Sequence, residues 1–115
     1  MINLARLASV VLTLNSISVL SVSVRAEEPP KQTVVIQSYR FQPKQITVKK
    51  GTSVLFINKD DAPHTVSPEN RADFTGTGRL LGGEKKVVTF DHPGNVKYFC
   101  DFHPSMEGTV VVTGN

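Results

Sequence analysis

The sequence has no tryptophan, two methionines and a single cysteine, Cys100, among its 115 residues. One cysteine cannot form a disulfide within the chain, which excludes the cross-linked scaffolds common among small exported domains. A lone cysteine is most often a small buried residue, but it can also pair with a second chain or bind a metal. The sequence around Cys100 therefore has to decide its role.

The chain also lacks an uninterrupted apolar run of the length that a membrane-spanning helix needs. Residues 1–26 contain one early cation, Arg6, then the mainly apolar stretch Leu7–Leu20 and a small-x-Ala pattern that ends at Ala26. This order predicts a secretory signal peptide over residues 1–26. The alternative, an uncleaved membrane anchor, is disfavoured because serine, threonine and asparagine interrupt the stretch, whereas a spanning helix needs about 20 apolar residues. We therefore expect no stable membrane insertion once the leader is cleaved.

Residues 27–115, which remain after the leader, carry almost no net charge. Without the leader, Arg6 and Arg25 are lost, so 13 − 2 = 11 Lys and Arg stand against 10 Asp and Glu. Nucleic-acid-binding domains normally present a clustered basic face, so this near-neutral domain is not expected to bind nucleic acid. The leader is similar to a simple bacterial export signal, which predicts a periplasmic location in preference to a thylakoid lumen.

No segment shows a helical hydrophobic period over the length of a helix. Residues 27–32 contain Pro29-Pro30 and are expected to form a flexible entry segment, which leaves 33–115 as the folded domain. In that domain, short runs rich in β-branched residues alternate with turn signals. This pattern predicts an all-β fold, an antiparallel Greek-key β-sandwich or barrel of about seven to eight strands. The segments expected as strands are 33–38, 45–48, 53–58, 64–66, 85–90, 94–99 and 108–112, and 67–81 is expected to be an irregular connection or a short helical turn.

Three donor side chains lie close together near the C-terminus. Cys100, His103 and Met106 are each separated by two residues, on a tight loop expected between the last two strands. Strand alternation places Cys100 on the inward face, together with Val96 and Tyr98. A thiolate, an imidazole and a distant thioether form the donor set that suits copper when a second histidine joins them.

Two histidines are candidates for that fourth donor. His64 directly follows Ala62-Pro63, just after the nearly continuous apolar strand 53–58, whereas His92 lies in a turn beside Pro93. The turn that opens the strand leading to Cys100 lies at the opposite end of a sandwich from the Cys100 loop. We therefore favour His64.

At this point the chain resembles the cupredoxins, the small type 1 blue-copper proteins of the plastocyanin, pseudoazurin and amicyanin group. The resemblance extends over essentially all of the domain after the leader. The two-residue gaps from Cys to His and from His to Met are most similar to amicyanin. The residues that carry the resemblance are Phe41-Gln42-Pro43, Ile46-Thr47-Val48-Lys49-Lys50-Gly51, Phe56-Ile57-Asn58-Lys59-Asp60, Pro63-His64-Thr65-Val66, Phe90-Asp91, Pro93-Gly94, Tyr98-Phe99-Cys100, His103-Pro104 and Met106-Glu107-Gly108-Thr109-Val110-Val111-Val112.

The resemblance implies that one copper ion, cycling between Cu(I) and Cu(II), is bound by four side chains. His64, Cys100 and His103 would be its equatorial ligands, and Met106 its weak axial ligand. It further implies a monomeric electron-transfer protein that shuttles single electrons between transient redox protein partners. The outward edge of His103 is expected to be the docking patch, ringed by groups such as Pro63, Phe102 and Pro104.

Other functions use the same residues differently. A copper carrier or storage protein has the same ligands but tends to display several exposed Met or His donors, and the domain after the leader has one Met and three His. A β-sandwich interaction module binds no metal. Enzymatic use of Cys100 as a nucleophile is disfavoured, because a buried thiol walled by Met106 and Phe102 is a poor nucleophile. Electron transfer is therefore the preferred function, and no catalytic residue is assigned.

The chain departs from the family pattern beside the first histidine. Family members commonly have Asn there, whose hydrogen bonds tie the two ligand loops together, and this chain has Thr65. The Thr65 hydroxyl is expected to replace part of that tie by bonding towards Asp101. The backbone N–H of Phe102 is also available as a donor near the Cys100 sulfur.

Overall fold

The computed structural model describes residues 9–22 and 30–114. The expected cleavage pattern at 24–26 and the start of the expected entry segment at 27–32 lie outside these ranges. Residues 9–22 form no helix or strand, and their side chains are exposed. Over the two described ranges, no helix is long and apolar enough to cross a membrane.

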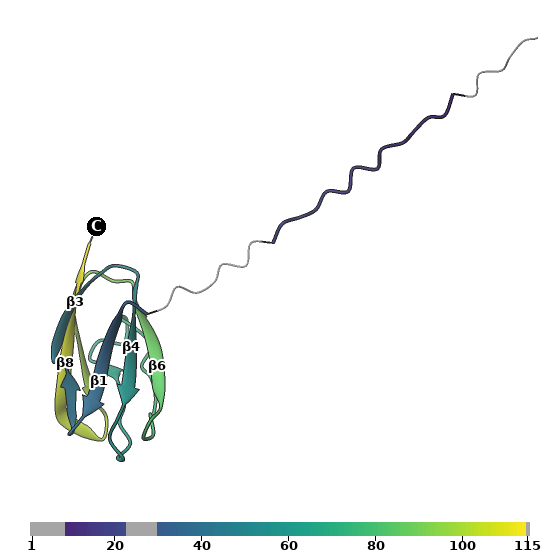
Figure 1. The fold of residues 1–115 in the computed structure, drawn as a ribbon. Coiled ribbons are helices and arrows are strands. Elements are labelled where there is room, and N and C mark those ends of the chain that lie inside the picture. Colours follow the sequence, from purple (N-terminus) through teal and green to yellow (C-terminus); the bar gives the residue numbers. More distant parts are fainter. Residues whose placement is uncertain (1–8, 23–29, 115) are drawn as a thin grey trace, which may run out of the picture.

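Eight strands form two sheets that pack face to face (Figure 1). The first sheet has the order β2-β1-β4-β6 and the second the order β3-β8-β7-β5. The all-β sandwich expected from the sequence is therefore confirmed. The strands are β1 (Gln32–Gln37), β2 (Arg40–Gln42), β3 (Gln45–Lys49), β4 (Thr52–Asn58), β5 (Ser67–Pro68), β6 (Lys85–Phe90), β7 (Gly94–Cys100) and β8 (His103–Thr113).

Each sheet contains one parallel pair in addition to its antiparallel pairs. β1 runs parallel to β4, and β3 runs parallel to β8. Because the chain passes from β2 to β3 and from β3 to β4, it changes sheet twice between the partners of the first parallel pair. One consequence is that β1 and β4 finish at the same end of the sandwich, with Ile36 opposite Asn58 (Figure 1).

Three local features differ from the expectation. The short strand β2 was not expected; it follows a two-residue turn at Ser38 and Tyr39, which have φ of 54° and 57°. Residues 64–66 do not form a strand, because His64 makes only an isolated bridge to Leu80. The irregular connection expected at 67–81 contains the short strand β5 and no helix.

The largest difference concerns the donor loop. The tight turn between β7 and β8 spans only residues 101–102, because Cys100 already pairs with His103 across it. His103 is the first residue of β8, and Met106 lies inside that strand. The expectation that all three donors share one loop is therefore wrong. Strand pairing fixes both ends of the turn and places the donors on a sheet.

The core lies between the two sheets and follows strand alternation. In β7, Val96, Tyr98 and Cys100 are at most 2% exposed, as the period-two pattern predicted. The Tyr98 ring packs edge-on against Phe41 and Phe56 from the opposite sheet, with centroid distances of 4.8 and 5.5 Å. This aromatic contact joins the two layers below the end of the sandwich where the donor residues gather.

Candidate metal centre

The fold brings together donor atoms from two separate segments. The ligand atoms of His64, Cys100 and His103 all lie within 4.8 Å of one another, the one such group of three among residues 9–22 and 30–114. The Cys100 Sγ lies 3.7 Å from Nδ1 of His64 and 3.7 Å from Nδ1 of His103. His64 and Cys100 are fully buried, and His103 is partly exposed. The sequence-based choice of His64 thus lies next to Cys100 in space.

The spacing of these atoms fits a single metal ion. A sulfur and a nitrogen bound to one first-row ion at about 2.3 and about 2.0–2.1 Å lie about 3.6 Å apart at a tetrahedral angle and about 3.8 Å apart at a trigonal angle. The observed separations of 3.7 Å fall between these limits. The sulfur therefore lies from each imidazole nitrogen at the separation expected when both atoms bind one ion.

Met106, the fourth expected donor, lies near the other three donors, whereas His92, the histidine that was not favoured, lies away from them. Met106 is 5% exposed on β8 and lies close to the other three donors. Two imidazoles, a thiolate and a nearby thioether make up the donor set of a blue-copper site, so these residues fit copper. His92 is exposed in the connection between β6 and β7, beside a groove lined by Asp73 and Lys86. It takes no part in the cluster.

Main-chain pairing and one carboxylate fix the position of His64. Its N–H donates to the carbonyl of Leu80, and the Leu80 N–H donates back, at 3.0 and 2.8 Å. The ring atom Nε2 lies 2.9 Å from Oδ2 of Asp60. An ionised carboxylate only accepts, so Nε2 carries a proton, and in the neutral imidazole the lone pair then lies on Nδ1, which faces the Cys100 sulfur. Asp60 therefore selects the tautomer that a metal needs.

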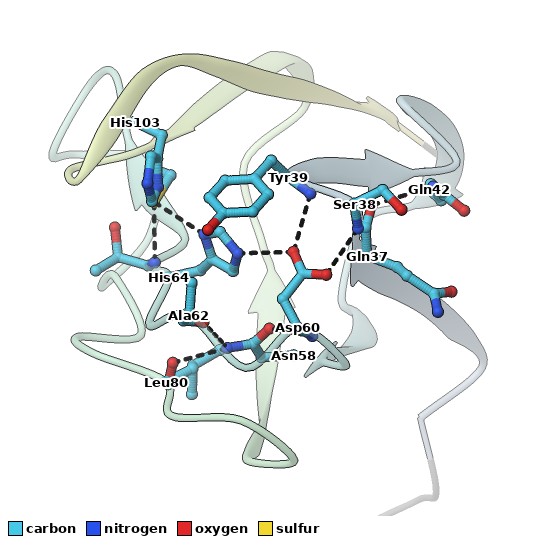
Figure 2. Close-up of polar contacts among 12 residues, drawn as sticks. Gln37, Ser38, Tyr39, Gln42, Asn58, Asp60, Ala62, His64, Leu80 and His103 are labelled. Atoms are coloured by element: carbon cyan, nitrogen blue, oxygen red, sulfur yellow. Dashed lines mark hydrogen bonds and ion pairs between the residues drawn. The ribbon is translucent and has the colours of Figure 1, made fainter.

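Asp60 also joins His64 to the turn between β1 and β2. Its Oδ1 accepts the N–H of Ser38 at 2.7 Å, and its Oδ2 accepts the N–H of Tyr39 at 2.9 Å. Figure 2 shows the carboxylate between the His64 imidazole and these two backbone nitrogen atoms. Burial raises the pKa of Asp60, but the hydrogen bonds from Tyr39, His64 and Ser38 together outweigh it and hold the pKa below its usual value.

The fully buried Asn58 shapes the loop that carries Asp60 and His64. Its side-chain nitrogen donates to the carbonyls of Ala62 and Leu80 at 2.9 and 3.0 Å, and its side-chain oxygen accepts the Asp60 N–H at 2.9 Å. An Asn at the end of a strand commonly accepts from the backbone two residues further on. Here that turn directs the Asp60 carboxylate towards His64.

A second network ties the His64 segment to the Cys100 turn. The N–H of Thr65 donates to the Cys100 Sγ at 3.4 Å, and the N–H of Asp101 donates to the Thr65 hydroxyl at 2.9 Å. The expected Thr65–Asp101 tie is confirmed. Ser67 extends it, since its hydroxyl lies 3.0 Å from the Thr65 hydroxyl and donates to the Asp101 carboxylate at 2.8 Å. Among the described hydrogen bonds the sulfur receives the N–H of Thr65 and none from Phe102.

Sequence reasoning missed Tyr39, Asp60 and Asn58 as parts of the site. The spacing Asn58-x-Asp60 and the position of His64 four residues after Asp60 are local signals that point to the Asp60 contact. No comparable signal exists for Tyr39. It reaches the site from another sheet through a turn made of Ser and Tyr, whereas such turns usually contain Asn-Gly or Asp-Gly.

Comparison with known proteins gives a consistent result. The Cupredoxin-like domain family matches residues 6–112 of this chain. Amicyanin-alpha of Methylorubrum extorquens is 34% identical over 91 residues, covering 75% of this chain and 76% of the relative. Plastocyanin of Nostoc punctiforme is 32% identical over 90 residues, covering 64% of this chain and 65% of the relative.

A solved structure of a larger protein is also similar. The Cu-containing nitrite reductase from Thermus scotoductus matches with a TM-score of 0.65 and 30% sequence identity. The match covers 82% of this chain but only 25% of the reductase chain. The same fold therefore occurs both in small proteins of similar length and as one part of an enzyme.

Proposed function

The chain belongs to the cupredoxin-like family, and from this premise we propose that it is an exported blue-copper electron-transfer protein. His64, Cys100 and His103 would hold the copper ion, with Met106 as a fourth, weak ligand. The bound ion supplies one-electron chemistry between Cu(I) and Cu(II). The protein passes single electrons between redox partners.

The observation that carries this proposal is the fixed arrangement of the donors. The Cys100 Sγ lies 3.7 Å from each Nδ1, and one ligand atom of each of the three residues lies within 4.8 Å of the others. Asp60 holds His64, the Thr65 N–H contacts the sulfur, and strand pairing holds His103. Ligands held this firmly move little between two oxidation states, and small movement favours electron transfer over chemistry on a substrate. The complete burial of His64 and Cys100 also keeps substrates away from their ligand atoms.

Location and partners follow as parts of the same proposal. Residues 1–26 serve as the signal peptide, and the domain acts in the periplasm as a monomer. Partners dock transiently around His103, where Pro63, Phe102 and Pro104 are exposed. Transient redox complexes use small interfaces, below about 1,200 Å² of buried surface. An apolar patch of a few side chains around one partly exposed ligand suits such a contact.

Addition of Cu(II) to the purified protein tests the proposal. An intense blue thiolate-to-copper absorption is expected, and Cys100→Ser should abolish it while leaving the fold intact by circular dichroism. The matched control is His92→Ala, which removes the histidine outside the cluster and should keep the absorption. Absence of the band in the parent protein would refute copper binding through Cys100.

Voltammetry and metal transfer then separate electron transfer from copper delivery. An electron-transfer protein gives a reversible one-electron wave and retains its copper against a weak chelator during many cycles. A copper carrier or storage protein, the alternative use of the same ligands, releases Cu(I) to an acceptor within the time of one cycle.

A further inference from the structure

Tyr39 is the one aromatic residue in the described ranges whose ring contacts both candidate ligand imidazoles. Its ring centroid lies 5.2 Å from that of His64 and 4.9 Å from that of His103, each at an interplanar angle of 89°. The two imidazole centroids are themselves 5.1 Å apart. Edge-to-face packing at these distances is attractive and orders the rings. Figure 2 shows the Tyr39 ring beside both histidines.

The same ring reaches solvent. Tyr39 is 53% exposed, whereas His64 is completely buried and has no surface of its own. Phe102 is similarly exposed at 50%, but no ring contact joins it to either histidine in the described part of the chain. Tyr39 is therefore the aromatic side chain that connects both imidazoles with the surface.

The backbone at Tyr39 has a conformation that this residue type rarely adopts. Ser38 and Tyr39 both have positive φ, which is uncommon for residues other than glycine, asparagine and aspartate. The Asp60 carboxylate accepts both of their N–H groups, and the same carboxylate accepts from His64. One side chain therefore fixes the turn that carries Tyr39 and the imidazole that Tyr39 covers.

We propose that Tyr39 is an electron port, a contact through which electrons pass between the surface and the two ligand imidazoles. This inference rests on the proposed function. In the exchange between two molecules, the Cu(I) protein loses one electron and becomes the Cu(II) protein, and its partner gains that electron. No proton moves, and Tyr39 keeps its phenol proton and is not itself oxidised.

Electron self-exchange of the copper-loaded protein tests the port, measured by NMR line broadening in mixtures of the Cu(I) and Cu(II) forms. This reaction has no net driving force, so a change in reduction potential does not alter its equilibrium. Tyr39→Leu, which removes the ring but keeps an apolar side chain, should lower the rate about tenfold, equal to about 1.4 kcal/mol of activation free energy. Tyr39→Phe, which keeps the ring, should hold the rate within about twofold of the parent, less than about 0.5 kcal/mol.

Leu81→Ala is the matched surface control. Leu81 is 45% exposed, follows the residue that pairs with His64, and lies outside the proposed port and docking patch. Its loss should leave the exchange rate unchanged. If Leu81→Ala slows exchange as much as Tyr39→Leu does, loss of any nearby apolar surface explains the effect and the port is refuted.

A second measurement needs no copper. In the metal-free protein, the Tyr39 ring current should shift the ring-proton resonances of His64 and His103. Tyr39→Leu should remove these shifts, and Tyr39→Phe should retain them. If the leucine variant does not fold, Tyr39→Asn takes its place, because Asn tolerates positive φ.

Besides the Leu81→Ala outcome, two results would overturn the port. The first is an unchanged exchange rate in Tyr39→Leu, whether or not Phe102→Leu lowers the rate, and the second is a loss of the blue absorption in both ring-less Tyr39 variants. The second would mean that Tyr39 builds the site and does not conduct through it. Failure of the proposed function looks different, since the parent protein itself would then show no blue absorption or no reversible electron transfer.

Discussion

Replacement of Thr65 by valine isolates the tie between the two ligand segments. Valine matches threonine in shape, and Thr65 is only 3% exposed, so packing is kept and one hydroxyl is lost. The lost oxygen accepts the Asp101 N–H at 2.9 Å and contacts the Ser67 hydroxyl at 3.0 Å. The direct contact of the Thr65 N–H with the Cys100 sulfur belongs to the backbone and remains.

The expected loss of stability follows from the group left without a partner. An unsatisfied buried donor costs about 1–3 kcal/mol, and because the Asp101 bond is only partly buried we expect about 1–2 kcal/mol for Thr65→Val. In a domain of this size each kcal/mol lowers the melting temperature by about 4–8 °C, so a decrease of about 5–15 °C is expected. The Ser67 hydroxyl keeps its bond to the Asp101 carboxylate, which limits the loss.

Urea unfolding of the metal-free protein measures this effect without the stabilisation that a bound ion adds. The transition midpoint should fall while the slope stays unchanged. Thr89→Val is the matched control, since it removes a threonine hydroxyl with a 2.9 Å bond to Ser53, but at an exposed position. It should change stability by less than about 0.5 kcal/mol. Equal effects of the two substitutions would refute the claim that the tie is structural.

Four further predictions concern other contacts of the described residues. Asp60→Asn removes the ionised acceptor of His64 and should lower metal affinity about 10–100-fold, as measured by competition with a chelator. Asp61→Asn is its control, and equal metal affinities of the two variants would contradict the role of Asp60. Gly108→Ala places a methyl group onto the Tyr98 ring and should destabilise the fold by about 1–3 kcal/mol or more. Gly114→Ala is its control, because the added methyl group contacts no other part of the described structure within 4 Å. The control should have no comparable effect in the same unfolding experiment. Tyr98→Phe removes a buried hydroxyl that has no hydrogen-bond partner among residues 9–22 and 30–114 and should leave stability unchanged or raise it by up to about 1 kcal/mol. A clear loss of stability would show that the hydroxyl has a partner. Because burial raises the pKa of Tyr98, its phenol should stay neutral at pH values where a tyrosine in water ionises, about pH 10, which a spectrophotometric titration can follow.

Much of the fold could be predicted from local sequence patterns. Runs such as 53–58 and 85–90 became β4 and β6 almost unchanged, because strand alternation and turn residues act over a few positions. The turn at Ser38 and Tyr39 was not readable, since neither residue favours positive φ. Contacts from a distant loop hold this turn, and a sequence window around it contains none of them.

The segment from Cys100 to Met106 likewise combines features that the sequence predicted with features that it did not. The order Cys100, His103, Met106 and the inward face of Cys100 follow from spacing and period two alone. The start of β8 at His103 does not, because it depends on pairing with Cys100 across a two-residue turn. Residues 103–107 have no strong strand pattern in the sequence, so the partner strand decided their conformation.

The sequence by itself determined which atoms can bind a metal and, through the resemblance of its motifs, which family the chain belongs to. Donor chemistry is a property of single side chains, and strand alternation is a property of short segments. Only the tertiary structure decided how these donors are held. Asp60, Thr65 and Tyr39 act through contacts between segments more than 20 residues apart. These contacts are hydrogen bonds of 2.9 Å and ring contacts with centroid separations of 4.9 and 5.2 Å, and they exist only once the two sheets have packed.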